Sequence, residues 1–402
     1  MPFDTDEYRL RRERAAAIAR EQGFAGLLVA DPANLYYLTG YNAWSMYMPQ
    51  FLLIAADDAS TVFISRECDA NGAHRTAALA REEIVGYPEH TVHQRDIHPC
   101  QWAAQYLRDT GWAKKFAGGR VAIEGDAHFF SVRSYLALKE GLPEWELVEG
   151  HGIVNWLRLV KSDAEIVLMR KAGHIVTNAM AVATEAISAG VPQHEVAAAI
   201  SHAQIAGVDG IDGDYPAIVP MLPTGAGADT PHLTWTPQPF VAGETVTIEI
   251  AGAHQRYHAP LARSVAVGKV PAELERLAGL TTEGLSLAID AVRPGLTAGE
   301  VAGVYWSFLA KHNLAKNSRL GYSIGIGYPP DWGEGTVSIR REDTTVLQPN
   351  MTFHFIAGMW FDGLGVEFSE SLRVAESGVE VLTHAPREMI QRPAVENLLA
   401  RS

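Results

Sequence analysis

Hydrophobic and polar positions follow two different patterns along the chain, and the pattern changes near residue 160. Before that point, short apolar runs typical of strands alternate with stretches of helical periodicity. The strand-like runs are 26–30, 51–56, 60–65 and 121–125, and the helical stretches are 6–22, 101–109 and 131–140. This alternation predicts an α/β domain with a mixed sheet over residues 1–160.

The second part of the chain, residues 161–402, opens with two helical patterns. Ser162 followed by Glu165 is typical of a capping box, so the first helix is expected to begin at Asp163. The expected helices are 163–188, 193–207, 271–291 and 298–313. A hairpin is expected over 244–268, with its turn near 254–255. The other expected strands are 217–222, 352–360, 367–374 and 379–383. This order predicts an α+β domain with helices packed on one side of a curved antiparallel sheet.

Composition and charge narrow the choice of partner. The 402 residues include 33 Lys and Arg against 47 Asp and Glu, which gives a formal net charge of −14. Nucleic acids and anionic membranes are bound by concentrated positive charge, so an acidic chain without a basic run favours a small-molecule partner. No apolar run has the roughly 18 residues of a membrane span, and the charged amphipathic start is unlike a signal peptide, so the expected location is the cytoplasm. Cys68 and Cys100 form neither a disulfide framework nor a C-x-x-C metal pair.

Candidate chemistry is concentrated in the second part of the chain. His232 ends a glycine-rich loop, and an imidazole suits proton transfer near neutral pH, although a structural histidine is the alternative. Glu249 lies within an apolar alternation, where a carboxylate is costly unless it is paired or functional, and an outward-facing glutamate is the alternative. Tyr257, His258 and Arg263 follow within the same predicted hairpin.

Two later segments add further candidates. Residues 320–335 combine glycine, aromatic residues and proline in one long turn, which is expected either as a pocket wall or as a packed surface loop. Residues 351–374 place His354 in one strand and Glu367 and Glu370 in the next. Because side chains alternate along a strand, Glu367 and Ser369 are expected on one face and Glu370 on the other, so at most one of the two glutamates faces a given cavity.

Long segments of the chain resemble the pita-bread family, which includes aminopeptidase P, prolidase, methionine aminopeptidase and creatinase. The resemblance rests on LRLVKSDAEIVLMRKAG, the PHL loop, VTIEIAG with LARSVAVG, GYSIG and SESLRVAESGVEVLT, and it covers nearly the whole chain. In the first domain, YYLTGYNAWSMYMPQ and SRECDANGAHRTA resemble creatinase. The resemblance implies a creatinase-like N-terminal α/β domain over 1–160 and a pita-bread catalytic domain over 161–402.

The peptidases of this family hold two metal ions on Asp, Asp, His, Glu and Glu, and those positions carry other residues here. In chain order they are Glu249, Pro260, Tyr322, Ile356 and Ser369. Pro and Ile offer no side-chain donor and Tyr is an uncommon ligand, so these residues do not build a two-metal centre. The resemblance therefore implies a hydrolase that, like creatinase, uses no metal and no other cofactor.

Within the family, GYSIGIGYPPDWGE and HFIAGMWFDGLGVEFSES resemble the branch that opens the cyclic amidine ring of the compatible solute ectoine. This implies hydrolysis of ectoine to N-acetyl-2,4-diaminobutyrate, with His232 as general base and Glu249, together with Glu367 or Glu370, holding the amidinium. The carboxylate of the substrate is expected at Arg66 or Arg263. An apolar wall is expected from Trp44, Tyr47 and Trp360, and the remaining candidate contacts are Tyr257, His258, Tyr322 and His354.

The residues leave several alternatives open. His232 can activate water, or a glutamate can attack the amidine carbon and form a covalent intermediate. One alternative is a creatinase, with creatine as its substrate. A second is an Xaa-Pro aminopeptidase with one metal ion, which the residues at the ligand positions disfavour. A third is a protein that binds the solute without turnover. The match of Arg66 to a creatinase arginine implies a homodimer with a shared active site, and the product implies a downstream deacetylase.

Overall fold

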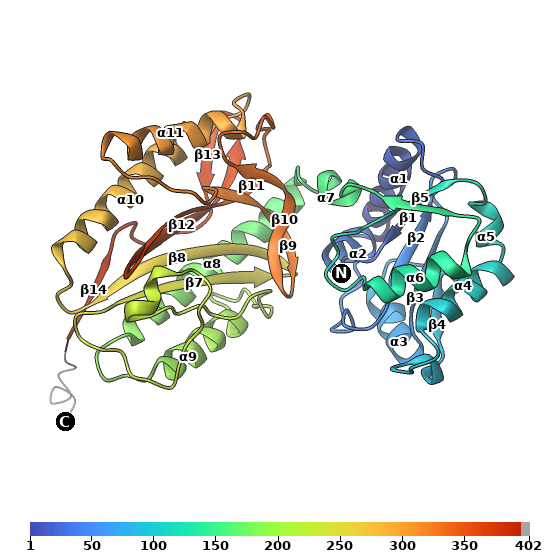
Figure 1. The fold of residues 1–402 in the computed structure, drawn as a ribbon, viewed down its shortest axis with the longest axis horizontal. Coiled ribbons are helices and arrows are strands. Elements are labelled where there is room, and N and C mark those ends of the chain that lie inside the picture. Colours follow the sequence, from blue (N-terminus) through green and yellow to red (C-terminus); the bar gives the residue numbers. More distant parts are fainter. Residues whose placement is uncertain (395–402) are drawn as a thin grey trace. The chain divides into compact units, whose positions relative to one another are not determined.

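The computed structural model describes residues 1–394 of the chain. The chain divides into two compact units, an N-terminal unit of residues 1–158 and a C-terminal unit that begins at residue 159 (Figure 1). Each unit has a sheet and a hydrophobic core of its own. None of the described helices combines the length and the apolar character needed to span a bilayer.

The N-terminal unit is built around a mixed sheet with the strand order β4-β3-β2-β1-β5-β6. Its strands are β1 (Gly26–Val29), β2 (Phe51–Ala55), β3 (Thr61–Arg66), β4 (Ile84–Tyr87), β5 (Arg120–Ile123) and β6 (Glu146–Glu149). Its helices are α1 (Thr5–Glu21), α2 (Pro32–Thr39), α3 (Glu67–Thr76), α4 (Pro99–Asp109), α5 (Trp112–Lys115), α6 (Val132–Gly141) and α7 (Ile153–Leu157), with short 3₁₀ turns η1 (Arg81–Glu83) and η2 (Glu89–Thr91). β1 pairs antiparallel with β2 and parallel with β5, so the predicted α/β domain with a mixed sheet is confirmed.

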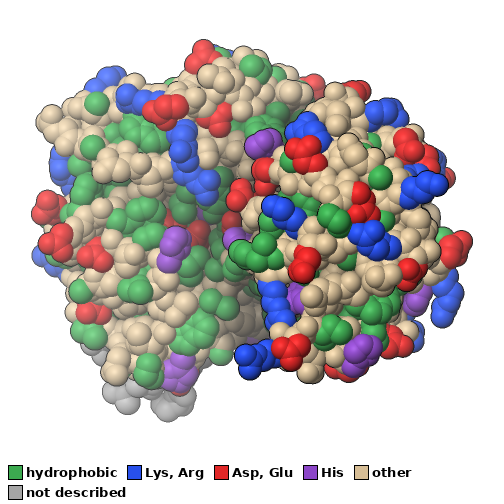
Figure 2. Space-filling model, turned by 45° about the vertical axis from the view of Figure 1, so that its right-hand side comes forward, with side chains coloured by type: hydrophobic (Ala, Val, Ile, Leu, Met, Phe, Trp, Pro, Cys, Tyr) green, Lys and Arg blue, Asp and Glu red, His purple; other side chains and the backbone are tan. Residues whose placement is uncertain are grey.

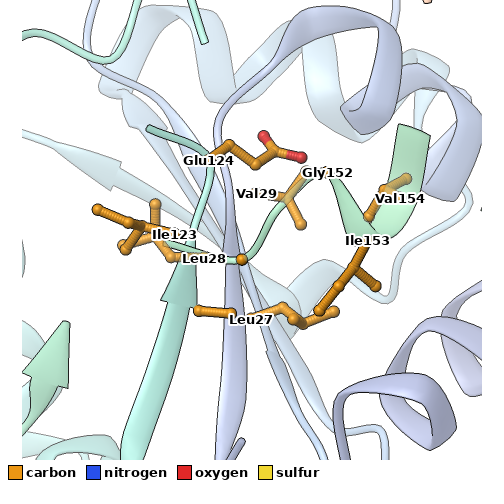
Figure 3. A pocket seen from close by; sticks show the side chains of 10 residues that line it. Leu27, Leu28, Val29, Ile123, Glu124, Gly152, Ile153 and Val154 are labelled. Atoms are coloured by element: carbon orange, nitrogen blue, oxygen red, sulfur yellow. The ribbon is translucent and has the colours of Figure 1, made fainter. Parts of the chain in front are cut away.

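A small cavity lies beside β1 and β5 in this unit (Figure 3). Its volume of about 10 Å³ has room for about one water molecule, which is too little for a substrate. Glu124 at its edge accepts hydrogen bonds from the backbone nitrogens of Ala30 and Asp31 and from Asn34 Nδ2, each at 2.7 Å. Burial, followed by the charge of Asp31, raises the pKa of Glu124 to about 8. Glu124 therefore joins the end of β5 to the start of α2, which is a structural role.

The C-terminal unit combines long helices with a curved antiparallel sheet. Its helices are α8 (Asp163–Ala186), α9 (Gln193–Ala206), α10 (Ala272–Ala291) and α11 (Ala298–Lys311), with a 3₁₀ turn η3 (Gly225–Asp229). Its strands are β7 (Thr245–His254), β8 (Tyr257–Val267), β9 (Gly321–Tyr328), β10 (Asp331–Ile339), β11 (Thr352–Phe361), β12 (Leu364–Ala375), β13 (Gly378–Val381) and β14 (Ile390–Arg392). The sheet order is β13-β12-β11-β9-β8-β14, with β10 paired to β9 and β7 paired to β8.

Helices cover one face of this sheet (Figure 1). α8 and α9 pack on β7 and β8 through a cluster that includes Ile200 and Ile248. α10 and α11 pack on β11 and β12 through a cluster that includes Leu285, Phe355 and Phe368. Because side chains alternate along each strand, the residues between these apolar positions point to the opposite face, where the polar candidates lie. The predicted fold class, an α/β domain followed by a pita-bread domain with a curved antiparallel sheet, is confirmed.

Local signals explain where several elements begin and turn. The side chain of Ser162 accepts a hydrogen bond from Glu165 N, and the Glu165 carboxylate accepts one from Ser162 N, so the predicted capping box starts α8. The β7–β8 hairpin turns at Gln255 and Arg256, whose φ angles are 49° and 64°. This pair of left-handed residues matches the twist of the flanking strands.

The secondary structure predicted from the hydrophobic pattern differs from the observed structure in three places. Residues 217–222 were predicted as a strand, but they form a single isolated bridge, between Met221 and Glu249. Residues 320–335 were predicted as one long turn, but β9 and the start of β10 occupy them as paired strands. Glycine and proline lower the strand propensity of this segment, but pairing of β9 with β11 holds it in the extended conformation. In the N-terminal unit, the elements that were not predicted are α2, α3, α5, α7, β4 and β6.

Candidate active site

A set of polar side chains lies on the sheet face that the helices leave uncovered. We call this set the polar face; its members are Glu249 on β7, Tyr322 on β9, His354 on β11, and Glu367 and Ser369 on β12. The strand register brings them together, because His354 is paired with Tyr322, Ile356 with Ser369, and Gly358 with Glu367. Directly opposed residues of antiparallel strands place their side chains on the same face.

Tyr322, His354 and Ser369 form a continuous hydrogen-bond network on the polar face. His354 Nδ1 lies 3.0 Å from Tyr322 Oη, and His354 Nε2 lies 2.7 Å from Ser369 Oγ. Trp332 Nε1 donates to Tyr322 Oη at 2.9 Å, and Ala262 N donates to Ser369 Oγ at 2.6 Å. Burial, with a smaller effect of the Arg319 charge, lowers the pKa of His354 to about 3. The ring is therefore neutral, so one ring nitrogen donates and the other accepts.

Two carboxyl groups lie buried on the same face. Glu249 is 3% exposed and Glu367 is 0% exposed. Burial, and next the charge of Asp331, raises the pKa of Glu249 to about 8. Burial also raises the pKa of Glu367 well above its ordinary value, the charge of Glu249 adds to this, and Lys316 partly offsets it. Removing two nearby carboxylates from water disfavours their charged forms, and a cation placed between them would favour those forms again.

The carboxyl group of Glu367 has an open hydrogen-bonding capacity. Among residues 1–394, neither of its two buried oxygens has a hydrogen-bond partner. A buried polar group without a partner costs free energy that packing alone does not return. Its presence on the polar face, beside Glu249, indicates a place for a ligand that donates hydrogen bonds and carries positive charge.

Glu370 points to the other side of β12, as the alternation predicts. It forms an ion pair with Arg263 at 2.6 Å and a second with Arg387 at 3.1 Å. Arg263 also donates to the carbonyl oxygens of four residues, which are Ala262, Ser369, Ala385 and Pro386. A guanidinium has five N–H donors, and these contacts use all of them. Arg263 therefore has no donor left for a substrate carboxylate.

Replacing Glu370 with Gln should destabilise the protein by about 3–5 kcal/mol, because the change leaves the buried Arg263 charge without its counter-ion. Thermal unfolding monitored by circular dichroism would measure the loss. Glu380→Gln is the matched control, since Glu380 pairs with Arg170 and Arg373 nearer the surface and should cost less than about 1 kcal/mol. Equal effects of the two substitutions would contradict a buried structural ion pair.

His232 is exposed on the loop that follows η3. The segment that leads to this loop, residues 221–229, is attached to strands of the polar face at two points, and Leu222 N donates to Leu233 O of the loop at 3.2 Å. Met221 and Glu249 exchange two backbone hydrogen bonds of 3.1 Å, and Asp229 Oδ2 accepts from Gly363 N, in the β11–β12 turn, at 3.0 Å. The loop that carries His232 is thereby held beside the strands that carry Glu249 and Glu367.

Tyr257 and His258 are buried within the hairpin and have internal partners. Tyr257 Oη donates to Glu165 at 2.7 Å. His258 Nε2 accepts from Ala217 N at 2.9 Å, and its Nδ1 lies 2.8 Å from Arg256 O. Burial, followed by the charge of Arg256, lowers the pKa of His258 to about 3. Both ring nitrogens of His258 are thus engaged in holding the backbone, which is a structural role.

Three of the candidate residues belong to the N-terminal unit. Trp44 and Tyr47 are 57% and 60% exposed, in the segment between α2 and β2. Arg66 donates two hydrogen bonds to the carboxylate of Glu89, at 2.7 and 2.6 Å. In this unit, Arg66 therefore already has an acidic partner.

The residues at the peptidase ligand positions do not fit a pair of metal ions. Pro260 and Ile356 have no donor atom, and the Tyr322 and Ser369 hydroxyl groups are committed to the His354 network. Across the described part of the chain, no group of three or more His, Cys, Asp or Glu residues is arranged to hold a metal. The chemistry of the donor set thus disagrees with a two-metal hydrolase.

Sequence reasoning did not single out Lys316 or Trp332. Lys316 is buried at 7% exposure and its charge acts on Glu367, while Trp332 is fully buried and holds Tyr322. Lys316 lies in the polar stretch before β9, where a lysine is common, so nothing in the sequence pattern indicated that its side chain is buried near Glu367. Figure 2 shows that Lys and Arg side chains are otherwise interspersed with Asp and Glu on the face in view.

Comparison with known proteins relates both units to one family. Residues 167–376 match metallopeptidase family M24, and residues 11–160 match the creatinase/prolidase N-terminal domain. The chain is 39% identical to the ectoine hydrolase of Halomonas elongata over 97% of this chain and 98% of that protein. It is 24% identical to the probable dipeptidase PepE of Mycobacterium tuberculosis over 97% and 98% of the two chains.

Solved structures of the family share the fold. The dipeptidase PepE from Mycobacterium ulcerans superposes with a TM-score of 0.80 at 23% identity, covering 97% of this chain and 99% of that one. The prolidase from Thermococcus sibiricus superposes with a TM-score of 0.81 at 21% identity, covering 96% and 99%. At these identities the likeness establishes the fold and leaves the reaction to the residues of the site.

Proposed function

The chain belongs to the M24 family of hydrolases that carry a creatinase/prolidase N-terminal domain, and we propose that it hydrolyses the cyclic amidine ring of ectoine. The observation that carries the proposal is the buried carboxyl pair of the polar face, in which Glu367 has two oxygens without a partner among the described residues. An amidinium is a planar cation with N–H donors, so it supplies both the charge and the hydrogen bonds that this pair lacks. Similarity to the Halomonas elongata ectoine hydrolase supports the same reaction.

The reaction balances with water as the only co-reactant. The water oxygen bonds to the amidine carbon, and the bond from this carbon to one ring nitrogen breaks. Both water hydrogens end on the released nitrogen, which leaves as an ammonium group, while the other nitrogen keeps the carbon as an acetyl group. The product is N-acetyl-2,4-diaminobutyrate. Because the amidinium carbon is already electron-poor, water can attack it when a base removes the proton.

Residues of this chain supply the steps. Glu249 and Glu367 hold the amidinium and offset its charge, and His232 takes a proton from the attacking water and returns it to the leaving nitrogen. A second route has a glutamate of the pair attack the carbon first, and water then releases the covalent intermediate. In both routes the Tyr322–His354–Ser369 network keeps a hydroxyl group beside the reacting atoms.

We also propose that the reaction is independent of metal. The support is the donor set at the peptidase ligand positions, where two of the residues, Pro260 and Ile356, have no donor atom. The substrate's own positive charge replaces the polarisation that a metal ion gives a neutral peptide carbonyl.

Mass spectrometry of reaction mixtures tests both proposals at once. Protein treated with a chelator and checked for bound metal is incubated with ectoine, and in parallel with creatine and an Xaa-Pro dipeptide. A product heavier than ectoine by one water supports the proposal. Turnover of creatine alone would move the activity to a creatinase, and peptide cleavage that returns only with added metal would overturn both proposals.

His232→Ala should lower kcat for ectoine by about 100-fold with little change in the melting temperature, because the exposed imidazole acts in proton transfer and packs against little. Initial rates and thermal unfolding measure the two effects. His194→Ala, an exposed histidine on α9, is the control that should leave both unchanged. Near-normal rates for His232→Ala would assign the base to another group.

A further inference from the structure

A buried ammonium group lies beside the carboxyl pair without an ion-pair partner. Lys316 Nζ donates to Ser318 Oγ at 2.6 Å and to Gly358 O at 2.8 Å. Within the described chain, no carboxylate lies close enough to form an ion pair with it. An ammonium has three N–H donors, so these contacts leave one free. Burial lowers the pKa of Lys316 to about 8, and the charge of Glu367 opposes that effect.

The indole of Trp360 brings a second free donor to the same place. Its Nε1 is buried and has no hydrogen-bond partner among residues 1–394. The Lys316 ammonium lies 4.9 Å from the centroid of the Trp360 ring. A Cβ atom on Gly358 would lie 2.1 Å from that ring, so the indole lies flat against the strand only because this residue is glycine.

Strand register places these donors next to the acceptors of the carboxyl pair. Gly358, which contacts both Lys316 and Trp360, is the residue directly paired with Glu367. The polar face therefore has unpaired acceptors at Glu367 and unpaired donors at Lys316 and Trp360, next to one another. Each unpaired buried group is costly alone, and a single ligand with a cationic and an anionic end would satisfy all of them.

We propose that Lys316 and the indole N–H of Trp360 form the subsite that receives the carboxylate of a zwitterionic substrate. The inference rests on the proposed function, in which the amidinium of the same molecule is held by the carboxyl pair. Ectoine carries its carboxylate on the ring carbon next to an amidinium nitrogen, so its two charged ends require a receptor whose donors and acceptors are adjacent.

The arginines expected for this role are less suited to it. All five donors of Arg263 are used internally, and Arg66 is paired with Glu89. Lys316 also lines a hollow of about 390 Å³, whose other charged lining residues are three arginines and one glutamate, Arg319, Arg340, Arg341 and Glu342. Positive potential around Lys316 favours the approach of an anionic group.

The test compares ectoine with 2-methyl-1,4,5,6-tetrahydropyrimidine, the same ring without the carboxylate. Calorimetric binding and initial rates are measured for the wild type, Lys316→Met and Trp360→Phe, the latter of which removes the N–H and keeps a ring. Lys139→Met is the matched control, because Lys139 also lies over an aromatic ring, 5.6 Å from the centroid of Tyr135, but in the N-terminal unit. Circular dichroism checks that each variant is folded.

Lys316→Met should weaken binding of ectoine by about 30-fold and Trp360→Phe by about 5-fold, while binding of the ring without the carboxylate changes less than about 3-fold. Lys139→Met should change neither ligand. Equal losses for both ligands, or no loss for ectoine, would overturn the subsite. If the wild type binds ectoine but does not hydrolyse it, the proposed function fails and the ratio of the two affinities still decides the subsite. If the wild type binds neither ligand, both proposals are overturned.

Discussion

Glu249→Gln should lower kcat/KM for ectoine by about 10³-fold or more and leave the fold intact. The substitution keeps the shape of the side chain and removes the negative charge that the buried site offers to the amidinium. Electrostatic groups aimed at the reacting charge in a site that excludes water contribute several kcal/mol to catalysis, which corresponds to this loss. Steady-state kinetics on folded protein measure it, and unchanged kinetics would refute a role for Glu249 in holding a cation.

The same substitution should stabilise the protein at high pH. Burial raises the pKa of Glu249 to about 8 in the folded state, against about 4.5 when it is exposed in the unfolded chain. Stability linked to this group is therefore complete below about pH 4.5 and is lost as pH rises toward 8, because the unfolded chain ionises first. Gln cannot ionise, so at pH 8 the variant should exceed the wild type by about 1–3 kcal/mol in free energy of unfolding.

Unfolding by urea at pH 5 and pH 8 would measure this difference. Glu185→Gln, on the exposed surface of α8, is the control and should change stability by less than about 0.5 kcal/mol at either pH. A Glu249→Gln variant that loses both activity and stability at pH 8 would indicate a structural carboxylate. Gain of stability with loss of activity is the combination expected of a functional site.

Affinity for ectoine should rise by about 30-fold between pH 6 and pH 8. The cationic ligand binds the ionised carboxyl pair, and a group with a pKa near 8 is about 1% ionised at pH 6. Because Glu249 and Glu367 influence each other, the midpoint belongs to the pair and not to either residue. Binding should therefore strengthen up to about pH 8 and weaken above it, because the Lys316 ammonium, whose pKa is also about 8, then loses its proton.

Calorimetry with the His232→Ala variant, in which turnover is expected to be about 100-fold slower, measures this dependence. Repeating the titration at pH 7 in buffers with different ionisation enthalpies counts the protons released, and about one per site is expected. Glu249→Gln should flatten the pH profile, which separates ionisation of this pair from other effects of pH. An affinity that is constant from pH 6 to pH 9 in the parent variant would show that the carboxyl pair is already ionised without ligand.

Local sequence patterns were sufficient for most of the regular structure. The helices α8, α9, α10 and α11 appeared as apolar positions with helical spacing, because each buries one stripe against the sheet. Alternation along β12 was enough to separate Glu367 from Glu370, since the period of a strand is two residues. The β9–β10 hairpin was missed because its strands are defined by pairing with distant segments, while its own glycines and prolines favour a turn.

The sequence by itself determined which chemical groups were available and which were absent, including the lack of donors at Pro260 and Ile356. Only the tertiary structure decided how those groups are used. Arg263 is removed from the site by partners more than 100 residues away, and Lys316 is brought to Glu367 through Gly358. Burial and pairing depend on contacts between segments far apart in the chain, so no local pattern encodes whether a charged side chain finds an internal partner or remains open to a ligand.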